Sequence, residues 1–99
     1  MKLVYSEQAV ADLVRLRTFL AEKDPAAAAR VAFELVSRVE RLREFPNLGV
    51  AVPQALQPGA IRDMVFGSYV VRYAAQAESL VVLRLWHQLE DRSTGHRTS

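Results

Sequence analysis

The sequence contains no cysteine, only four glycines and four prolines, and no long apolar run. Without cysteine there is no disulfide framework and no thiolate metal site, which suits a reducing cytoplasm. No apolar stretch approaches the ~20 residues of a membrane-spanning helix, and the opening residues MKLVYSEQ lack a signal-peptide core. The 51% hydrophobic content excludes a disordered chain. We therefore expect one cytoplasmic domain over residues 1–99, with a frayed tail over about 93–99.

Lysine is scarce as well: the thirteen basic residues are two lysines and eleven arginines, and the net charge is +2. Arginine suits carboxylate or phosphate partners because its planar fork makes bidentate contacts. The modest net charge argues against sequence-specific nucleic-acid binding. There is no glycine-rich phosphate loop, no nucleophile elbow, and no pair of His or carboxylate residues at metal-ligand spacing. No cofactor and no metal site are therefore expected.

Two amphipathic helices are predicted in the first half of the chain, after a short strand over Lys2–Tyr5. Ser6 offers an N-cap for a helix that extends to about Lys23. Asp24 and Pro25 restart the chain as the N-cap and first residue of a second helix, which ends at the Pro46–Gly49 turn. The link between the helices is short, so they are expected to form an antiparallel hairpin.

The second half of the chain predicts an antiparallel sheet. An irregular connector over 50–59 leads into strands over about 60–66, 69–76 and 79–87. Gly67 and Ser68 fit the two-residue loop of a type II′ hairpin, which places Asp63 directly opposite Arg72 as a cross-strand pair. The predicted fold class is therefore α+β, with an N-terminal strand and a helical hairpin packed on a small antiparallel sheet.

Arginines interrupt these apolar strands at positions 62, 72 and 84. Each is either exposed, paired with a carboxylate, or placed to bind an anion. Strict alternation assigns Arg62, Arg84 and Trp86 to one sheet face together with Val71 and Tyr73. It assigns Val70, Leu85 and His87 to the other face. Both faces are apolar enough to cover the hairpin, and no intrachain partner is evident for Arg62 or Arg84.

Three motifs occur in a fixed order along nearly the whole chain. The first helix begins with Ala9-x-x-Asp12-Leu13, the second ends in LREFPNLG over 42–49, and the last strand closes with Leu85-Trp86-His87-Gln88. Each motif alone is weak, but their order and spacing resemble the ParE/RelE superfamily of toxins from bacterial type II toxin–antitoxin systems, and its ParE-like branch in particular. The resemblance implies a helical hairpin on an antiparallel sheet that the first strand completes.

The resemblance leaves two chemistries open. RelE-like members cleave messenger RNA on the ribosome with clustered cations and a Tyr or His near the C-terminus, whereas ParE-like members inhibit DNA gyrase by binding it. An RNase of this kind would use Arg62, Arg84 and His87. The lysines of the RelE-like pattern are missing, Val70 stands where that pattern has a cation, and no tyrosine follows Tyr73. We therefore expect a gyrase-inhibiting binder without catalytic residues.

For that binder, the expected target-binding residues are Arg62, Arg84, Trp86, His87 and Arg92. The resemblance also implies a small cognate antitoxin, ParD-like or similar, with which the toxin forms a hetero-oligomer. Its amphipathic segment is expected to fill a groove on the hairpin. The leucines and valine that should divide between the core and such a groove are Leu13, Leu16, Leu20, Val31 and Leu35. A non-toxic interaction domain of the same fold is the remaining alternative.

Overall fold

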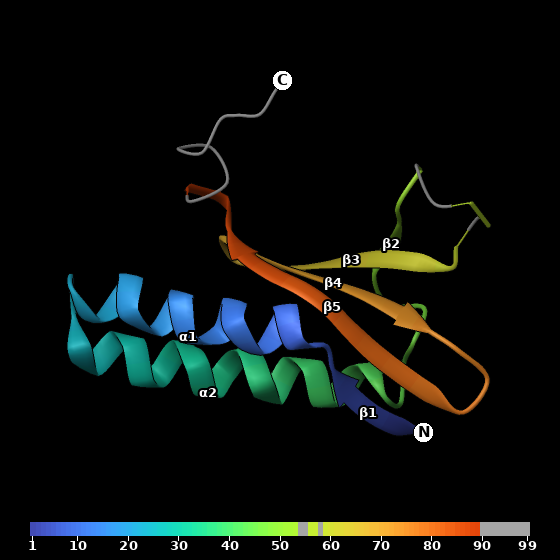
Figure 1. Cartoon of the computed structure of the whole chain (residues 1–99), viewed down its shortest axis with the longest axis horizontal. Coiled ribbons are helices and arrows are strands. Elements are labelled where there is room, and N and C mark those ends of the chain that lie inside the picture. The colour runs from blue at the N-terminus through green and yellow to red at the C-terminus, as the bar shows by residue number, and fades with distance from the viewer. Residues whose placement is uncertain (54–55, 58, 90–99) are drawn as a thin grey trace.

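The structure is a computed structural model that describes residues 1–53, 56–57 and 59–89. Two helices lie side by side and pack on the same face of a sheet (Figure 1). The elements in chain order are β1 (Lys2–Tyr5), α1 (Glu7–Ala21), α2 (Pro25–Leu42), β2 (Val50–Ala51), β3 (Ile61–Phe66), β4 (Tyr69–Ala75) and β5 (Ser79–His87). The α+β fold class and the strand–hairpin–sheet order are as predicted. The expected tail over 93–99 lies outside the described residues.

Both helices begin where the sequence predicts. The Oγ of Ser6 accepts a hydrogen bond from the backbone N–H of Ala9 at 3.0 Å, and the Oδ1 of Asp24 accepts one from Ala27 at 3.2 Å. These caps satisfy N–H groups that have no partner within the helix. Helix α1 ends two residues earlier than expected, at Ala21.

The sheet has five strands in the order β1-β5-β4-β3-β2 (Figure 1). Strand β1 pairs in parallel with β5, and the other pairs are antiparallel. The expectation of an irregular connector over 50–59 is wrong at its start, because Val50 and Ala51 form β2 and pair with Asp63 and Arg62 of β3. Two residues are too short for an alternation pattern to reveal a strand.

The β3–β4 hairpin has the predicted register. Phe66 is paired with Tyr69, and Asp63 lies opposite Arg72. Gly67 has a φ of 59°, the left-handed conformation that a tight hairpin turn demands of its first residue. Nε and Nη2 of Arg72 donate to the two carboxylate oxygens of Asp63 at 2.8 and 2.9 Å. This confirms the expected cross-strand ion pair.

A β-bulge in β5 changes which side chains share a face. Arg72 is paired with Arg84 but Tyr73 is paired with Val82, so Leu83 is an additional residue on β5. The extra residue reverses the alternation from that point onward. The strict alternation predicted from the sequence is therefore wrong for the end of β5.

The two helices cover one face of the sheet, and this helix-covered face contains Leu85 and His87, which are paired with Val71 and Tyr69 of β4. Arg84 and Trp86 lie with Arg72 on the other face, called the open face below. The hydrophobic core fills the space between the hairpin and the helix-covered face. It is made of Ala9, Leu16, Leu35, Val39, Leu42, Met64, Val71, Tyr73, Leu80, Val82 and Leu85.

Candidate functional site

The described candidate residues for target binding fall into two groups. Arg84, Trp86 and His87 lie in the second half of β5, and Arg62 lies on β3. Arg92 lies outside the described residues. The expectation that Arg62 and Arg84 have no intrachain partner is wrong, since each donates hydrogen bonds within the chain.

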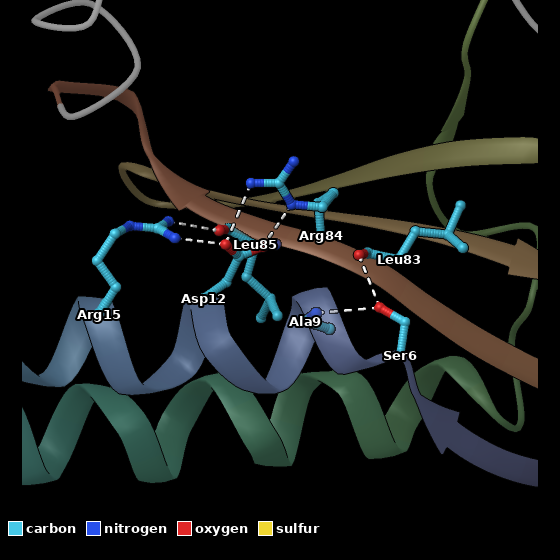
Figure 2. A network of polar contacts seen from close by, with 7 residues as sticks. All are labelled: Ser6, Ala9, Asp12, Arg15, Leu83, Arg84 and Leu85. Carbon is cyan, nitrogen blue, oxygen red and sulfur yellow. Dashed lines mark hydrogen bonds and ion pairs between the residues drawn. The ribbon is translucent and has the colours of Figure 1, made fainter.

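Arg84 is held by Asp12, a buried carboxylate that α1 presents to the edge of β5 (Figure 2). Nε of Arg84 donates to Oδ2 of Asp12 at 2.8 Å, and Nη2 donates to Oδ1 at 3.2 Å. Asp12 also accepts a hydrogen bond from Arg15, one turn further along α1, and one from the backbone N–H of Leu85 at 2.9 Å. Every acceptor position of this carboxylate is directed at a donor.

Asp12 was not expected to be a functional residue. The signal was present in the sequence: Asp12 falls on the apolar stripe of α1 between Ala9 and Leu16, where a carboxylate needs partners from another element.

The pKa of Asp12 lies below its usual range. Burial alone would raise it, because low dielectric disfavours the charged form, but the hydrogen bonds from Arg84, Arg15 and the Leu85 N–H outweigh that effect. The pKa of Arg84 is raised in turn, chiefly by its hydrogen bond to Asp12. The pair is therefore fully ionised near neutral pH.

Side chains of α1 and of its N-cap residue Ser6 take the place of a neighbouring strand along this part of β5. The pairing of β1 with β5 ends at Val82. Beyond it, the Oγ of Ser6 donates to the carbonyl oxygen of Leu83 at 2.9 Å, and Nη2 of Arg15 donates to that of Leu85 at 3.1 Å (Figure 2). The Leu85 N–H is bonded to Asp12, so the edge of β5 is closed by polar side chains rather than by backbone.

Trp86 lies on the open face beside two arginines. The guanidinium of Arg72 is 5.2 Å from the centre of the Trp86 ring, within the range of a cation–π contact. Val65 on the same face is 59% exposed. Tryptophan and arginine are enriched at the centres of protein interfaces, and the exposed valine adds apolar surface beside them.

His87 is part of an aromatic cluster on the other face. Its ring centre lies 4.9 Å from that of Tyr69 in an edge-on arrangement and 5.9 Å from that of Phe19 on α1. Its Nδ1 accepts a hydrogen bond from the backbone N–H of Leu89 at 3.0 Å. These contacts fix the ring against α1, away from Arg84.

Arg62 anchors the turn after α2. Its Nη1 donates to the carbonyl oxygen of Gly49 at 2.8 Å. The hydroxyl of Tyr73 accepts from the Gly49 N–H at 2.9 Å and donates to the carbonyl oxygen of Pro46 at 2.6 Å. A Cβ at position 49 would lie 2.8 Å from the carbonyl oxygen of Asp63, which explains the glycine that ends the LREFPNLG motif. Arg62 thus holds the Gly49 turn by a hydrogen bond on the helix-covered side of the sheet.

The three residues that the alternative RNase reading would use, Arg62, Arg84 and His87, do not converge. Arg62 is paired with Tyr73 and Arg84 with Arg72, and adjacent residues of β4 point to opposite faces. His87 faces α1, whereas Arg84 lies on the open face.

The residues expected at an antitoxin groove divide between the core and its margin. Leu16 and Leu35 are 2% and 1% exposed and belong to the core. Leu13 and Val31 are half-buried and pack against it, and Leu20 is also half-buried.

An open groove of about 470 Å³ lies elsewhere, between α2 and the outer edge of β3. Arg38 and Arg41 line it on the α2 side, with Leu48, Val50 and Met64 among its apolar residues.

The described part of the chain contains neither a metal-ligand cluster nor a membrane-spanning helix. It contains no group of three or more His, Cys, Asp or Glu residues placed to hold a metal ion. Neither described helix is long and apolar enough to cross a membrane.

Known proteins resemble this chain over almost its full length. A family model described as the ParE toxin of the type II toxin–antitoxin system parDE matches residues 3–92. Toxin RelE1 of Caulobacter vibrioides is 38% identical over 89 residues, which cover 88% of this chain and 92% of the relative. Toxin RelE3 of the same organism is 32% identical over 81 residues, covering 82% and 87%.

A solved structure has the same fold. The structure described as the chromosomal ParDE TA system from P. aeruginosa superposes with a TM-score of 0.74 at 19% sequence identity, covering 88% of this chain and 95% of that one. At this identity the likeness establishes the fold of two helices on a five-stranded mixed sheet.

Proposed function

Because this chain belongs to the ParE toxin family of type II toxin–antitoxin systems, we propose that it acts by binding DNA gyrase rather than by cutting RNA. The chain is a toxin component of the ParE/RelE type. Its relatives from Caulobacter vibrioides are named RelE, so messenger-RNA cleavage on the ribosome is the competing function.

The separation of Arg62, Arg84 and His87 is the observation that carries this proposal. RNA cleavage needs a base for the 2′-hydroxyl, cations for the charged transition state and a proton donor for the leaving oxygen, all within reach of one phosphate. Here Arg62 is bonded to the Gly49 turn and His87 is packed against aromatic rings. A binder needs no such convergence.

We propose that the target-binding surface is the open sheet face around Arg84 and Trp86. Large amphipathic side chains of this kind contribute most of the binding energy in protein interfaces. His87 and Arg62 act through the structure, the first by fixing the end of β5 against α1 and the second by fixing the Gly49 turn. Arg92, which lies outside the described residues, stays a proposed target-binding residue.

The neutralising partner is proposed to be a small ParD-like antitoxin that covers apolar surface at the helices. Leu13, Leu20 and Val31 lie at the margin of the core, where partner side chains reach them. The groove beside α2 offers a second contact, and its arginines at 38 and 41 favour an antitoxin segment that carries carboxylates.

A side-by-side assay with purified toxin tests the proposal. One reaction contains gyrase and relaxed plasmid, and the other contains translating ribosomes and messenger RNA. We expect supercoiling to stop while messenger RNA stays intact. Cleavage of messenger RNA in the ribosomal A site, abolished by His87→Ala, would contradict the proposal and favour the endonuclease.

A further inference from the structure

The ion pair between Asp12 and Arg84 joins a buried residue to an exposed one. The side chain of Asp12 is 2% exposed and that of Arg84 is 48% exposed. We propose that Asp12 is a positioning residue that holds Arg84 as a preorganised binding site for an acidic side chain of the toxin's target protein. This rests on the proposed function, because it places the site on the target-binding face.

The geometry leaves one side of the Arg84 guanidinium open for a ligand. Asp12 occupies Nε and one hydrogen of Nη2. Within the described chain no hydrogen bond engages Nη1, so Nη1 and the second hydrogen of Nη2 remain as a two-pronged edge. That edge matches the two oxygens of a carboxylate.

Asp12 is suited to hold Arg84 because it is itself immobile. Its two oxygens accept hydrogen bonds from Arg15, from Arg84 and from the Leu85 backbone N–H, which ties the carboxylate to both α1 and β5. An unpaired exposed arginine would lose rotamer freedom on binding, whereas Arg84 has already lost it on folding. Preorganisation of this kind strengthens binding without any additional contact.

The local charge favours an anion. The guanidinium of Arg84 carries its charge to the surface, because its side chain is 48% exposed while that of its partner Asp12 is 2% exposed. An incoming carboxylate meets this exposed cation directly.

The surroundings favour a protein carboxylate over a nucleic-acid phosphate. Trp86 and the exposed Val65 lie on the same face as Arg84 and offer apolar contact around the charge. Binding along a phosphate backbone relies on several cations, whereas Nη1 and Nη2 of Arg84 offer one two-pronged contact beside Trp86. The partner is therefore an apolar protein surface with an acidic side chain at its centre.

A double-mutant cycle on toxicity tests the proposal. The variants are Asp12→Asn, Arg84→Ala and their combination, and the readout is the amount of toxin, measured by immunoblot, that halves the growth rate. We expect each single variant to require about 10-fold more toxin, equivalent to about 1.4 kcal/mol. The double variant should be no weaker than Arg84→Ala alone, because the contribution of Asp12 to target binding requires Arg84. A merely structural Asp12 would instead give additive losses.

Two further variants control for charge and folding. Arg43 is 42% exposed, similar to Arg84, and is paired with the exposed Glu40, so Arg43→Ala removes a similarly exposed arginine away from β5 and should leave toxicity unchanged. Arg84→Lys keeps the charge but loses the fork, and it should also cost about 10-fold. If Asp12→Asn fails to fold, Arg84→Lys decides the outcome, and wild-type toxicity of that variant would overturn the proposal.

Several other outcomes would overturn the proposal, and one would separate it from the gyrase proposal. Wild-type toxicity of Arg84→Ala, or additivity in the cycle, overturns the proposal. The proposal is also overturned if Arg84→Ala weakens the binding of purified antitoxin but leaves growth arrest unchanged. In that case the partner of Arg84 is the antitoxin and not the target. If the same coupling between Asp12→Asn and Arg84→Ala is measured in messenger-RNA cleavage on the ribosome, the anion bound by Arg84 is an RNA phosphate, and the proposal is overturned. If gyrase proves insensitive while the coupling on growth persists, the gyrase proposal fails and the carboxylate site stands for another target protein.

Discussion

The hydroxyl of Tyr73 offers the sharpest test of how the turn before β2 is held. In Tyr73→Phe, the buried N–H of Gly49 loses its acceptor, and the carbonyl oxygen of Pro46 loses its donor. A buried group without a partner costs about 1–3 kcal/mol, and a second lost hydrogen bond adds about 1 kcal/mol. We therefore expect the free energy of unfolding to fall by about 2–4 kcal/mol. For a domain of this size that lowers Tm by at least about 8 °C.

Tyr5→Phe is the matched control for this variant. Its hydroxyl is buried but has no hydrogen-bond partner among the described residues. Removing it deletes an unsatisfied polar group, so the stability should stay unchanged or rise. Urea unfolding at neutral pH measures both variants. Equal losses in Tyr73→Phe and Tyr5→Phe would show that the hydroxyl bonds of Tyr73 contribute nothing, and the explanation of the turn would be wrong.

Three other predictions concern packing and charge. Gly49→Ala should cost about 1–3 kcal/mol in urea unfolding, because the new Cβ would lie 2.8 Å from a backbone carbonyl of β3. Leu35→Ala should lower the free energy of unfolding by about 2–5 kcal/mol, because Leu35 lies in the core. Phe33, on the same helix, is 73% exposed, so Phe33→Ala should change it by no more than about 0.5 kcal/mol. Similar losses in the two variants would contradict the assigned core. Folding lowers the pKa of Asp12, so its carboxylate stabilises the protein above the ordinary aspartate pKa of about 3.9, and that contribution is lost as the pH falls through the lower folded-state value. The stability difference between the wild type and Asp12→Asn should therefore be largest near pH 7 and shrink below about pH 4, and a difference that grows in acid would refute the assignment.

The sequence predicts most strongly those features that local chemistry determines. Ser6 and Asp24 mark the helix starts, because a capping side chain acts within three residues of itself. The Asp63–Arg72 pair followed from the two-residue loop at Gly67, since a tight loop sets the register of the whole hairpin.

The features that the sequence did not reveal depend on contacts between distant segments. The bulge at Leu83 leaves an ordinary run of apolar residues in the sequence, yet it moves Leu85 and Trp86 to the faces opposite those that alternation predicts. The partner of Arg84 is 72 residues away in the chain. The position of Asp12 on an apolar stripe predicts that its carboxylate needs a hydrogen-bonding partner. Only the packing of α1 on β5 identifies that partner as Arg84.

The stoichiometry of gyrase inhibition tests the central claim, that this toxin acts by binding, most directly. Purified gyrase at a fixed concentration is titrated with toxin, and the supercoiling of relaxed plasmid is measured at each ratio. A binder inhibits in proportion to the gyrase that it occupies, so inhibition should saturate at a fixed ratio of toxin to gyrase, with Arg84→Ala shifted to higher toxin concentrations. Full supercoiling at a large excess of folded wild-type toxin, with messenger RNA cleaved by trace amounts of it on translating ribosomes, would contradict the account.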